Sequence, residues 1–157
     1  MPTLTVDNVK VEVPEGASVL DACRQAGSSV PTLCYLEGVQ AIGACRICLV
    51  EIEGAKTLVA SCTQPASEGM VVKTNSTRAR RARRAVLELL LSEHDGDCYT
   101  CVRSGDCELR QQSIDLGVDQ VTYPDWASLF ERWWREAPAG TVLALDEFPS
   151  LASSSRE

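Results

Sequence analysis

The sequence has few aromatic residues and almost no histidine. Aromatic side chains make up 5% of the 157 residues, and the single histidine is His94. A catalytic site built on several histidines, or on a serine activated by a histidine, is therefore not expected. With so few aromatic side chains, bound metal is expected to supply part of the stability that a larger core would provide. The sequence also contains no nucleotide-binding glycine motif.

Basic charge is scarce as well. Fifteen Lys and Arg residues stand against 22 Asp and Glu residues, for a formal net charge of −7. Nucleic-acid binding is excluded, because contacts to phosphate need a basic field. The longest apolar stretch, residues 85–91, is too short to cross a bilayer. Residues 1–7 lack the basic start and apolar region of a signal peptide. We therefore expect a cytoplasmic protein without direct membrane insertion.

The cysteines are the most informative residues. In a reducing compartment, clustered cysteines are more often metal ligands than disulfide partners. A first group has the spacing C-x10-C-x2-C-x13-C and consists of Cys34, Cys45, Cys48 and Cys62. A [2Fe-2S] cluster needs four converging thiolates, and a C-x2-C loop supplies two of them. Gly43 and Ala44 leave backbone N–H groups free to approach the sulfurs. The first group therefore predicts a [2Fe-2S] site.

A second group has the spacing H-x3-C-x2-C-x5-C and consists of His94, Cys98, Cys101 and Cys107. Three cysteines and one histidine also form structural zinc sites, and spacing alone leaves the two metals open. Zinc sites usually pair two short chelating couples. Here one C-x2-C is flanked by single ligands and follows a predicted iron–sulfur domain, so we favour a [4Fe-4S] cluster. Cys23, on the apolar side of a predicted helix, is expected to be a small buried hydrophobe.

The pattern of residues 1–75 predicts a small mixed sheet crossed by one helix, a β-grasp arrangement. Alternating apolar residues predict a hairpin around Asp7-Asn8, and further strands are expected at 47–52, 57–60 and 71–74. Ser18 and Asp21 are spaced as a capping box, which predicts a helix through Ala26. Residues 76–121 are expected to form a helical second domain with helices near 76–92 and 106–116.

The first of these two helices has an expected apolar side and an arginine-rich start. The expected apolar side consists of Ala79, Ala82, Val86, Leu89 and Leu90. The arginines are Arg78, Arg80, Arg81, Arg83 and Arg84. We favour a solvated face whose side-chain stems cover apolar surface. The alternative is a cationic rim that offsets the negative charge of the clusters or docks an acidic partner.

Residues 122–157 form a C-terminal arm of different character. All three tryptophans lie between Pro124 and Pro138, in a segment that predicts a short amphipathic helix. Such a helix packs on the core or docks onto another subunit.

The two cysteine motifs together resemble a known family. Residues 42–51 followed by Cys62 resemble the [2Fe-2S] domain that opens the iron–sulfur-rich peripheral subunit of respiratory complex I. They are equally similar to the iron–sulfur subunit of NAD-linked nickel–iron hydrogenases and to the N-terminal part of iron-only hydrogenases. Residues 92–109 resemble the adjoining [4Fe-4S] segment, which in these families is held by one histidine and three cysteines.

The resemblance covers about residues 1–121 and implies an α+β protein. It implies a β-grasp [2Fe-2S] ferredoxin-like domain followed by a small helical [4Fe-4S] domain. Electrons would pass between a flavin- and NAD(P)-binding iron–sulfur subunit and a hydrogenase subunit of a hetero-oligomer, electron-bifurcating complexes included. The chain would not be catalytic alone. These relatives usually continue into further clusters, whereas no cysteine follows Cys107 here. The alternatives are a complex-I-like dehydrogenase subunit, a free ferredoxin, a hydrogenase fragment, or a zinc-stabilised interaction module.

Overall fold

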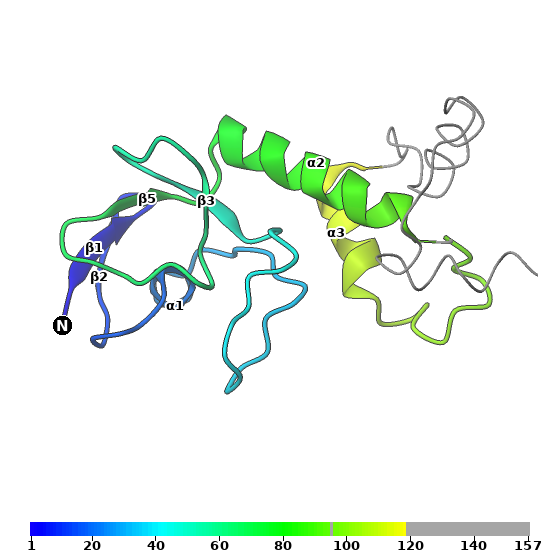
Figure 1. Ribbon diagram of the computed structural model, residues 1–157, viewed down its shortest axis with the longest axis horizontal. Coiled ribbons are helices and arrows are strands. Elements are labelled where there is room, and N and C mark those ends of the chain that lie inside the picture. Colours follow the sequence, from blue (N-terminus) through cyan, green and yellow to red (C-terminus); the bar gives the residue numbers. More distant parts are fainter. Residues whose placement is uncertain (95, 119–157) are drawn as a thin grey trace, which may run out of the picture. The chain divides into compact units, whose positions relative to one another are not determined.

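The computed structural model describes residues 1–94 and 96–118, which belong to one compact unit. The elements follow the chain as strands β1 (Thr3–Val6) and β2 (Val9–Glu12), helix α1 (Val19–Gln25), strands β3 (Leu49–Ile52), β4 (Val59–Ala60) and β5 (Val71–Lys73), and helices α2 (Thr77–Ser92) and α3 (Glu108–Leu116) (Figure 1). The predicted C-terminal arm and its tryptophan helix lie outside the described residues.

The five strands form one mixed sheet in the order β2-β1-β5-β3-β4. Strand β1 is parallel to β5, and the other neighbouring pairs are antiparallel. Asp7 and Asn8 make the β1–β2 turn with φ of 46° and 72°, as a two-residue hairpin loop requires. The mixed sheet predicted from the sequence is confirmed. Strand β3 begins at Leu49, two residues later than predicted, because Ile47 and Cys48 belong to the preceding loop.

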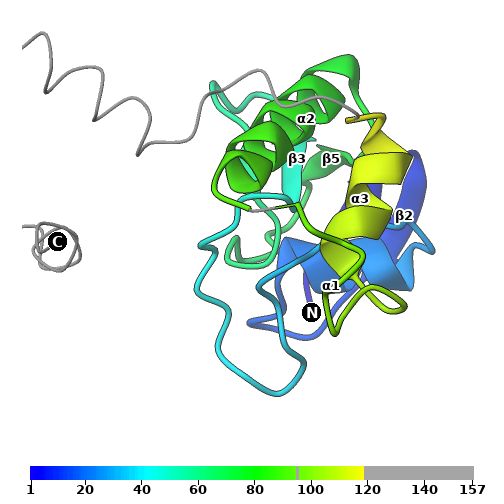
Figure 2. The same cartoon turned by 90° about the vertical axis from the view of Figure 1, so that its right-hand side faces the viewer.

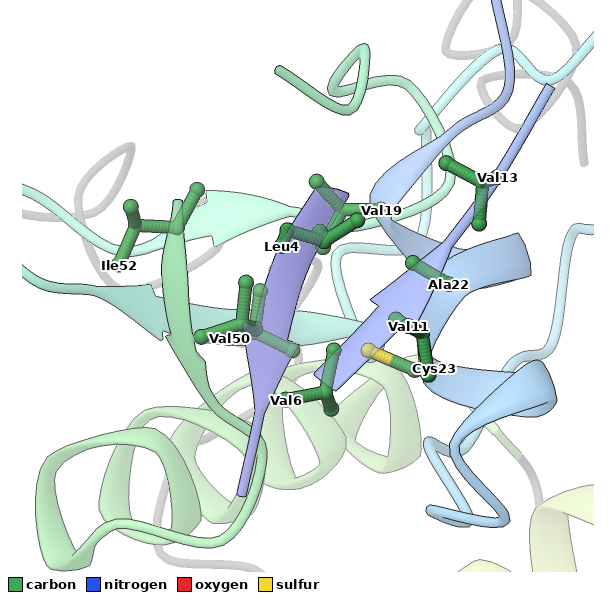
Figure 3. Close-up of a cluster of buried hydrophobic side chains, with 10 residues drawn as sticks. Leu4, Val6, Val11, Val13, Val19, Ala22, Cys23, Val50 and Ile52 are labelled. Carbon is green, nitrogen blue, oxygen red and sulfur yellow. The ribbon is translucent and has the colours of Figure 1, made fainter. Parts of the chain in front are cut away.

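Helix α1 packs on one face of this sheet. The capping box is confirmed, because Ser18 accepts the Asp21 N–H and the Asp21 carboxylate accepts the Ser18 N–H. The helix contributes Val19, Ala22 and Cys23 to the main core (Figure 3). Facing them are Leu4, Val6, Val11, Val13, Val50, Ile52 and Val72. Each fully buried Val or Leu side chain contributes about 1.5–3 kcal/mol of transfer free energy.

Helix α2 packs against β3 and α3 (Figures 1 and 2). Its buried residues are Ala79, Arg83 and Leu87, which recur at intervals of four. The predicted apolar side was therefore partly wrong: Leu89 is 51% exposed, whereas Leu87 is fully buried. Helix α3 starts two residues later than predicted, after Cys107 at its N-cap, and ends at Gly117. Within residues 1–94 and 96–118, the structure has no helix with the length and apolarity that a bilayer crossing demands.

Candidate metal centres

The structure arranges the first cysteine group in two pairs, Cys34 with Cys45 and Cys48 with Cys62. Cys34 and Cys45 lie in the long loop between α1 and β3, and Cys48 ends that loop. Strands β3 and β4 pair with Leu49 opposite Ala60, which carries Cys48 and Cys62 to the same end of the pair. The sulfurs of Cys48 and Cys62 are 3.4 Å apart. The Cys45 N–H points at the Cys34 sulfur, with 3.5 Å between nitrogen and sulfur.

The four thiols also interact electrostatically. Burial raises the pKa of Cys62 to about 12, and the hydrogen bond shared with the Cys48 sulfur and the negative charges of Cys48, Cys34 and Cys45 add to the shift. Burial likewise raises the pKa of Cys45. At Cys34 burial acts in the same direction, but backbone N–H groups of Cys45 and Ala44 outweigh it and lower the pKa. Four thiolates this close repel one another, and a bound cation would relieve the repulsion.

A tight approach between two loop segments shapes this site. Gly43 has φ of +63°, and a Cβ at this position would lie 2.9 Å from Cγ2 of Thr63, next to Cys62. Arg46 also has a positive φ, of 56°. Glycine is therefore required at position 43 both for its backbone conformation and for the absence of a side chain.

The second group is placed on the segment between α2 and α3. The Cys107 sulfur caps α3 by accepting the Arg110 N–H at 3.5 Å, and the Cys101 sulfur accepts the Arg103 N–H at 3.4 Å. His94 is exposed, and its Nδ1 accepts the Gly96 N–H at 3.0 Å. Cys98 is partly buried. Two of the three sulfurs thus accept backbone N–H groups.

The donor arrangement distinguishes between single ions and clusters. Among residues 1–94 and 96–118, no group of three or more His, Cys, Asp or Glu side chains is close enough to hold one metal ion. A structural zinc site needs four ligands around a single ion. A [2Fe-2S] cluster instead takes two thiolates on each iron, so sulfurs arranged in pairs suit it. The first group fits this cluster.

A cavity of about 380 Å³ lies where the two groups meet. Its wall includes Cys34 and Cys45 of the first group and Cys107 of the second. Leu33, Leu90 and Leu109 supply apolar surface, and Arg103 and Glu108 complete the lining. Sulfurs of both groups therefore border one space.

Two residues at these sites were not identified from the sequence. Ile47, between Cys45 and Cys48, is fully buried in a cluster with Leu87 of α2 and Val118. Arg83 is 4% exposed and donates to the Leu49 carbonyl, so the solvated face expected for the arginines does not include it. The spacing Ala79, Arg83, Leu87 was the available signal, because residues four apart share one side of a helix.

Family comparisons agree with this geometry. Residues 1–77 match the 2Fe-2S iron-sulfur cluster binding domain. Residues 83–122 match the NADH-ubiquinone oxidoreductase-G iron-sulfur binding region, of the 4Fe-4S kind. The two predicted cofactors, a [2Fe-2S] and a [4Fe-4S] cluster, are thereby confirmed. The individual ligands, and the division of the chain at residue 75, stay predictions.

Similar proteins occur in two kinds of redox complex. The chain is 45% identical over 129 residues to the NADP-reducing hydrogenase subunit HndD of Solidesulfovibrio fructosivorans, covering 78% of this chain and 22% of the relative. It is 44% identical over 117 residues to the mitochondrial NADH-ubiquinone oxidoreductase 78 kDa subunit of Neurospora crassa, covering 74% of this chain and 16% of the relative.

A solved structure is similar as well. The crystal structure of NAD+-reducing [NiFe]-hydrogenase in the H2-reduced state contains a chain with a TM-score of 0.73 and 34% identity, over 80% of this chain and 53% of that one. The chain spans about a fifth of the length of the curated relatives described above. Residues 1–77 match the 2Fe-2S cluster-binding domain and residues 83–122 match the NADH-ubiquinone oxidoreductase-G iron–sulfur binding region, and the chain is similar to iron–sulfur subunits of hydrogenases and of complex I.

Proposed function

We propose that the chain is an electron-transfer subunit, without catalytic activity of its own, that relays single electrons between a flavin- and NAD(P)-binding subunit and a hydrogenase subunit. The observation that carries this proposal is the cavity bordered by Cys34 and Cys45 of one group and Cys107 of the other. Clusters held by cysteines that line one cavity of about 380 Å³ would be near enough for an electron to pass directly between them. When bound, the two clusters supply all of the redox chemistry.

The proposed ligands divide between the two regions. A β-grasp domain of residues 1–75 holds the [2Fe-2S] cluster, and a helical domain of residues 76–121 holds the [4Fe-4S] cluster. The first cluster would be held by Cys34, Cys45, Cys48 and Cys62, and the second by His94, Cys98, Cys101 and Cys107. The protein orients these ligands and tunes them through backbone N–H groups, such as that of Cys45 toward the Cys34 sulfur. We expect the protein in the cytoplasm, where the reducing environment keeps cysteines available as metal ligands.

A complex-I-like dehydrogenase subunit is the second candidate, and the similarity to the Neurospora crassa subunit supports it. We place the hydrogenase first because the Solidesulfovibrio fructosivorans relative and the solved structure are both hydrogenases. Purification of the native complex, with identification of its subunits, separates the two. A colourless preparation with zinc and no acid-labile sulfide would instead favour the zinc-stabilised module.

The relay is tested in the native complex by replacing a proposed ligand. Cys48→Ser should abolish the [2Fe-2S] signal in low-temperature EPR and interrupt electron flow from NAD(P)H to the terminal acceptor. The flavin subunit should still reduce an artificial acceptor. Cys23→Ala is the matched control, because Cys23 is a fully buried cysteine in the sheet core, outside the proposed set. Normal coupled turnover in Cys48→Ser would contradict the proposal.

A further inference from the structure

Arg83 carries a buried positive charge at the first site. Its side chain is 4% exposed, and its Nε and Nη2 donate to the Leu49 carbonyl at 2.9 and 2.6 Å. The ion pairs found among the described residues join Arg78 to Glu51 and Arg84 to Glu88, and neither involves Arg83. A buried guanidinium that meets only a neutral carbonyl has a large desolvation cost unless negative charge lies nearby.

Three acidic groups lie near this guanidinium. Burial lowers the pKa of Arg83, and Cys48, Cys23 and Asp7 oppose that shift, with Cys48 first in size. Cys23 is a neutral thiol at physiological pH, since burial raises its pKa to about 11. The Asp7 carboxylate is already engaged by Thr74 and Ser28. Cys48, a proposed cluster ligand, directly precedes Leu49 in the chain, so the hydrogen bonds to the Leu49 carbonyl hold the guanidinium beside the site where a bound cluster would carry negative charge.

Arg83 connects the two matched regions of the chain. It is the first residue of the region matched to the 4Fe-4S family, yet its guanidinium reaches the end of the cysteine loop in the 2Fe-2S region. Neighbouring arginines of the same helix, such as Arg81, are exposed. Their charges are screened by water and salt, whereas a charge buried in the protein acts through a much lower dielectric.

We propose that Arg83 is the buried counter-charge of the [2Fe-2S] site and sets the reduction potential of that cluster. The inference rests on the proposed ligand set. Reduction adds one electron to the cluster, from the flavin subunit in the complex or from dithionite in vitro, so the reduced form is more negative by one charge. A fixed cation stabilises that form more than the oxidised form and raises the potential. Arg83 would therefore act on the cluster through its charge, without coordinating iron.

The test compares three variants in the cluster-loaded protein, by EPR-monitored redox titration with iron and sulfide analysis. Arg83→Gln keeps hydrogen-bond donors toward Leu49 but loses the charge, and should shift the [2Fe-2S] reduction equilibrium at least tenfold toward the oxidised form, about 59 mV more negative for a one-electron couple. Arg83→Lys keeps the charge and should shift the equilibrium less than threefold. Arg81→Gln removes the same charge from an exposed site of the helix and should leave the midpoint unchanged.

The outcomes separate the inference from the proposed function. A loaded Arg83→Gln protein with the wild-type midpoint, or equal shifts in Arg83→Gln and Arg83→Lys, would overturn the counter-charge and leave a purely structural role. If Arg83→Gln does not fold, Arg83→Met, which also removes the charge, takes its place: a tenfold shift toward the oxidised form supports the proposal, and a wild-type midpoint overturns it. Absence of iron and sulfide from the wild-type protein would instead refute the proposed function.

Discussion

Ile47 of the cysteine loop and Leu87 of helix α2 are both fully buried and belong to one apolar cluster. The Ile47 side chain is thus packed between the two regions that match different iron–sulfur families. The loop that we propose to hold the [2Fe-2S] cluster therefore depends on the helix that follows the sheet. Isolated from α2, this loop would lose the apolar contacts that shape it.

Leu87→Ala should destabilise the protein by about 2–5 kcal/mol, because it leaves a cavity beneath Ile47. Chemical denaturation measures this loss, and release of iron to a chelator should become faster because the cysteine loop is loosened. Leu89→Ala, at a position 51% exposed on the same helix, should change stability by about 0.5 kcal/mol or less. Equal effects of the two substitutions would contradict the packing described here.

Gly43→Ala should reduce the loading of the [2Fe-2S] site, measured as iron and sulfide per chain. The new Cβ would meet Cγ2 of Thr63 at 2.9 Å and would also occupy a strained backbone conformation. Gly38→Ala is the control, because φ there is +79° and no atom lies within 4 Å of the added Cβ. Adding Thr63→Ser to Gly43→Ala removes Cγ2 and should restore part of the loading of the [2Fe-2S] site. Equal losses in both glycine variants would show that backbone strain alone is responsible.

Asp7→Asn should lower the free energy of unfolding at neutral pH by on the order of 1 kcal/mol. Burial raises the pKa of Asp7, but hydrogen bonds from Thr74 and Ser28 outweigh it and lower the pKa below 3.8. A carboxyl with a lowered folded-state pKa stabilises the protein above its unfolded pKa, and this contribution is lost as pH falls through the folded pKa.

The difference between wild type and Asp7→Asn should therefore stay constant from pH 8 to pH 5. It should shrink only below about pH 4, near the pKa of an unfolded aspartate. Denaturation curves at several pH values measure it, with the exposed Glu15→Gln as a charge-matched control that should have little effect. Asparagine tolerates the positive φ of position 7, so the substitution keeps the backbone conformation of the turn. A difference that varies across pH 5–8 would contradict this assignment.

His94→Cys should move the [4Fe-4S] midpoint to more negative potential while the cluster is retained. A thiolate adds negative charge where the imidazole is neutral, and exchange of thiolate for imidazole is known to raise the potential in Rieske centres. Redox titration followed by EPR measures the midpoint. Ser92→Cys adds a thiol two residues away, outside the proposed set, and should leave it unchanged. An unaltered midpoint in His94→Cys would remove His94 from the ligand set.

Features of the fold that depend on residues close together in the sequence were predictable from the sequence. The Asp7-Asn8 turn and the Ser18–Asp21 capping box follow from backbone conformations and hydrogen bonds within a few positions, and both are present. The [2Fe-2S] type follows from ligand chemistry and spacing, whereas the [4Fe-4S] type was favoured over zinc because the motif follows a predicted iron–sulfur domain. The family matches confirm both cluster types. The boundary of β3 was less accurate, because β-branched character alone does not separate a strand from a buried loop residue such as Ile47.

The sequence by itself determined the two cofactors and the order of strands and helices along the chain, because these depend on residue chemistry, motif spacing and local periodicity. The tertiary structure alone decided which arginine is buried, which leucine of α2 faces the loop, and that Cys34 and Cys45 share a cavity with Cys107. These features arise from packing between segments tens of residues apart. Such packing depends on the rotation of each helix about its axis and on the path of each loop, which local sequence pattern does not specify.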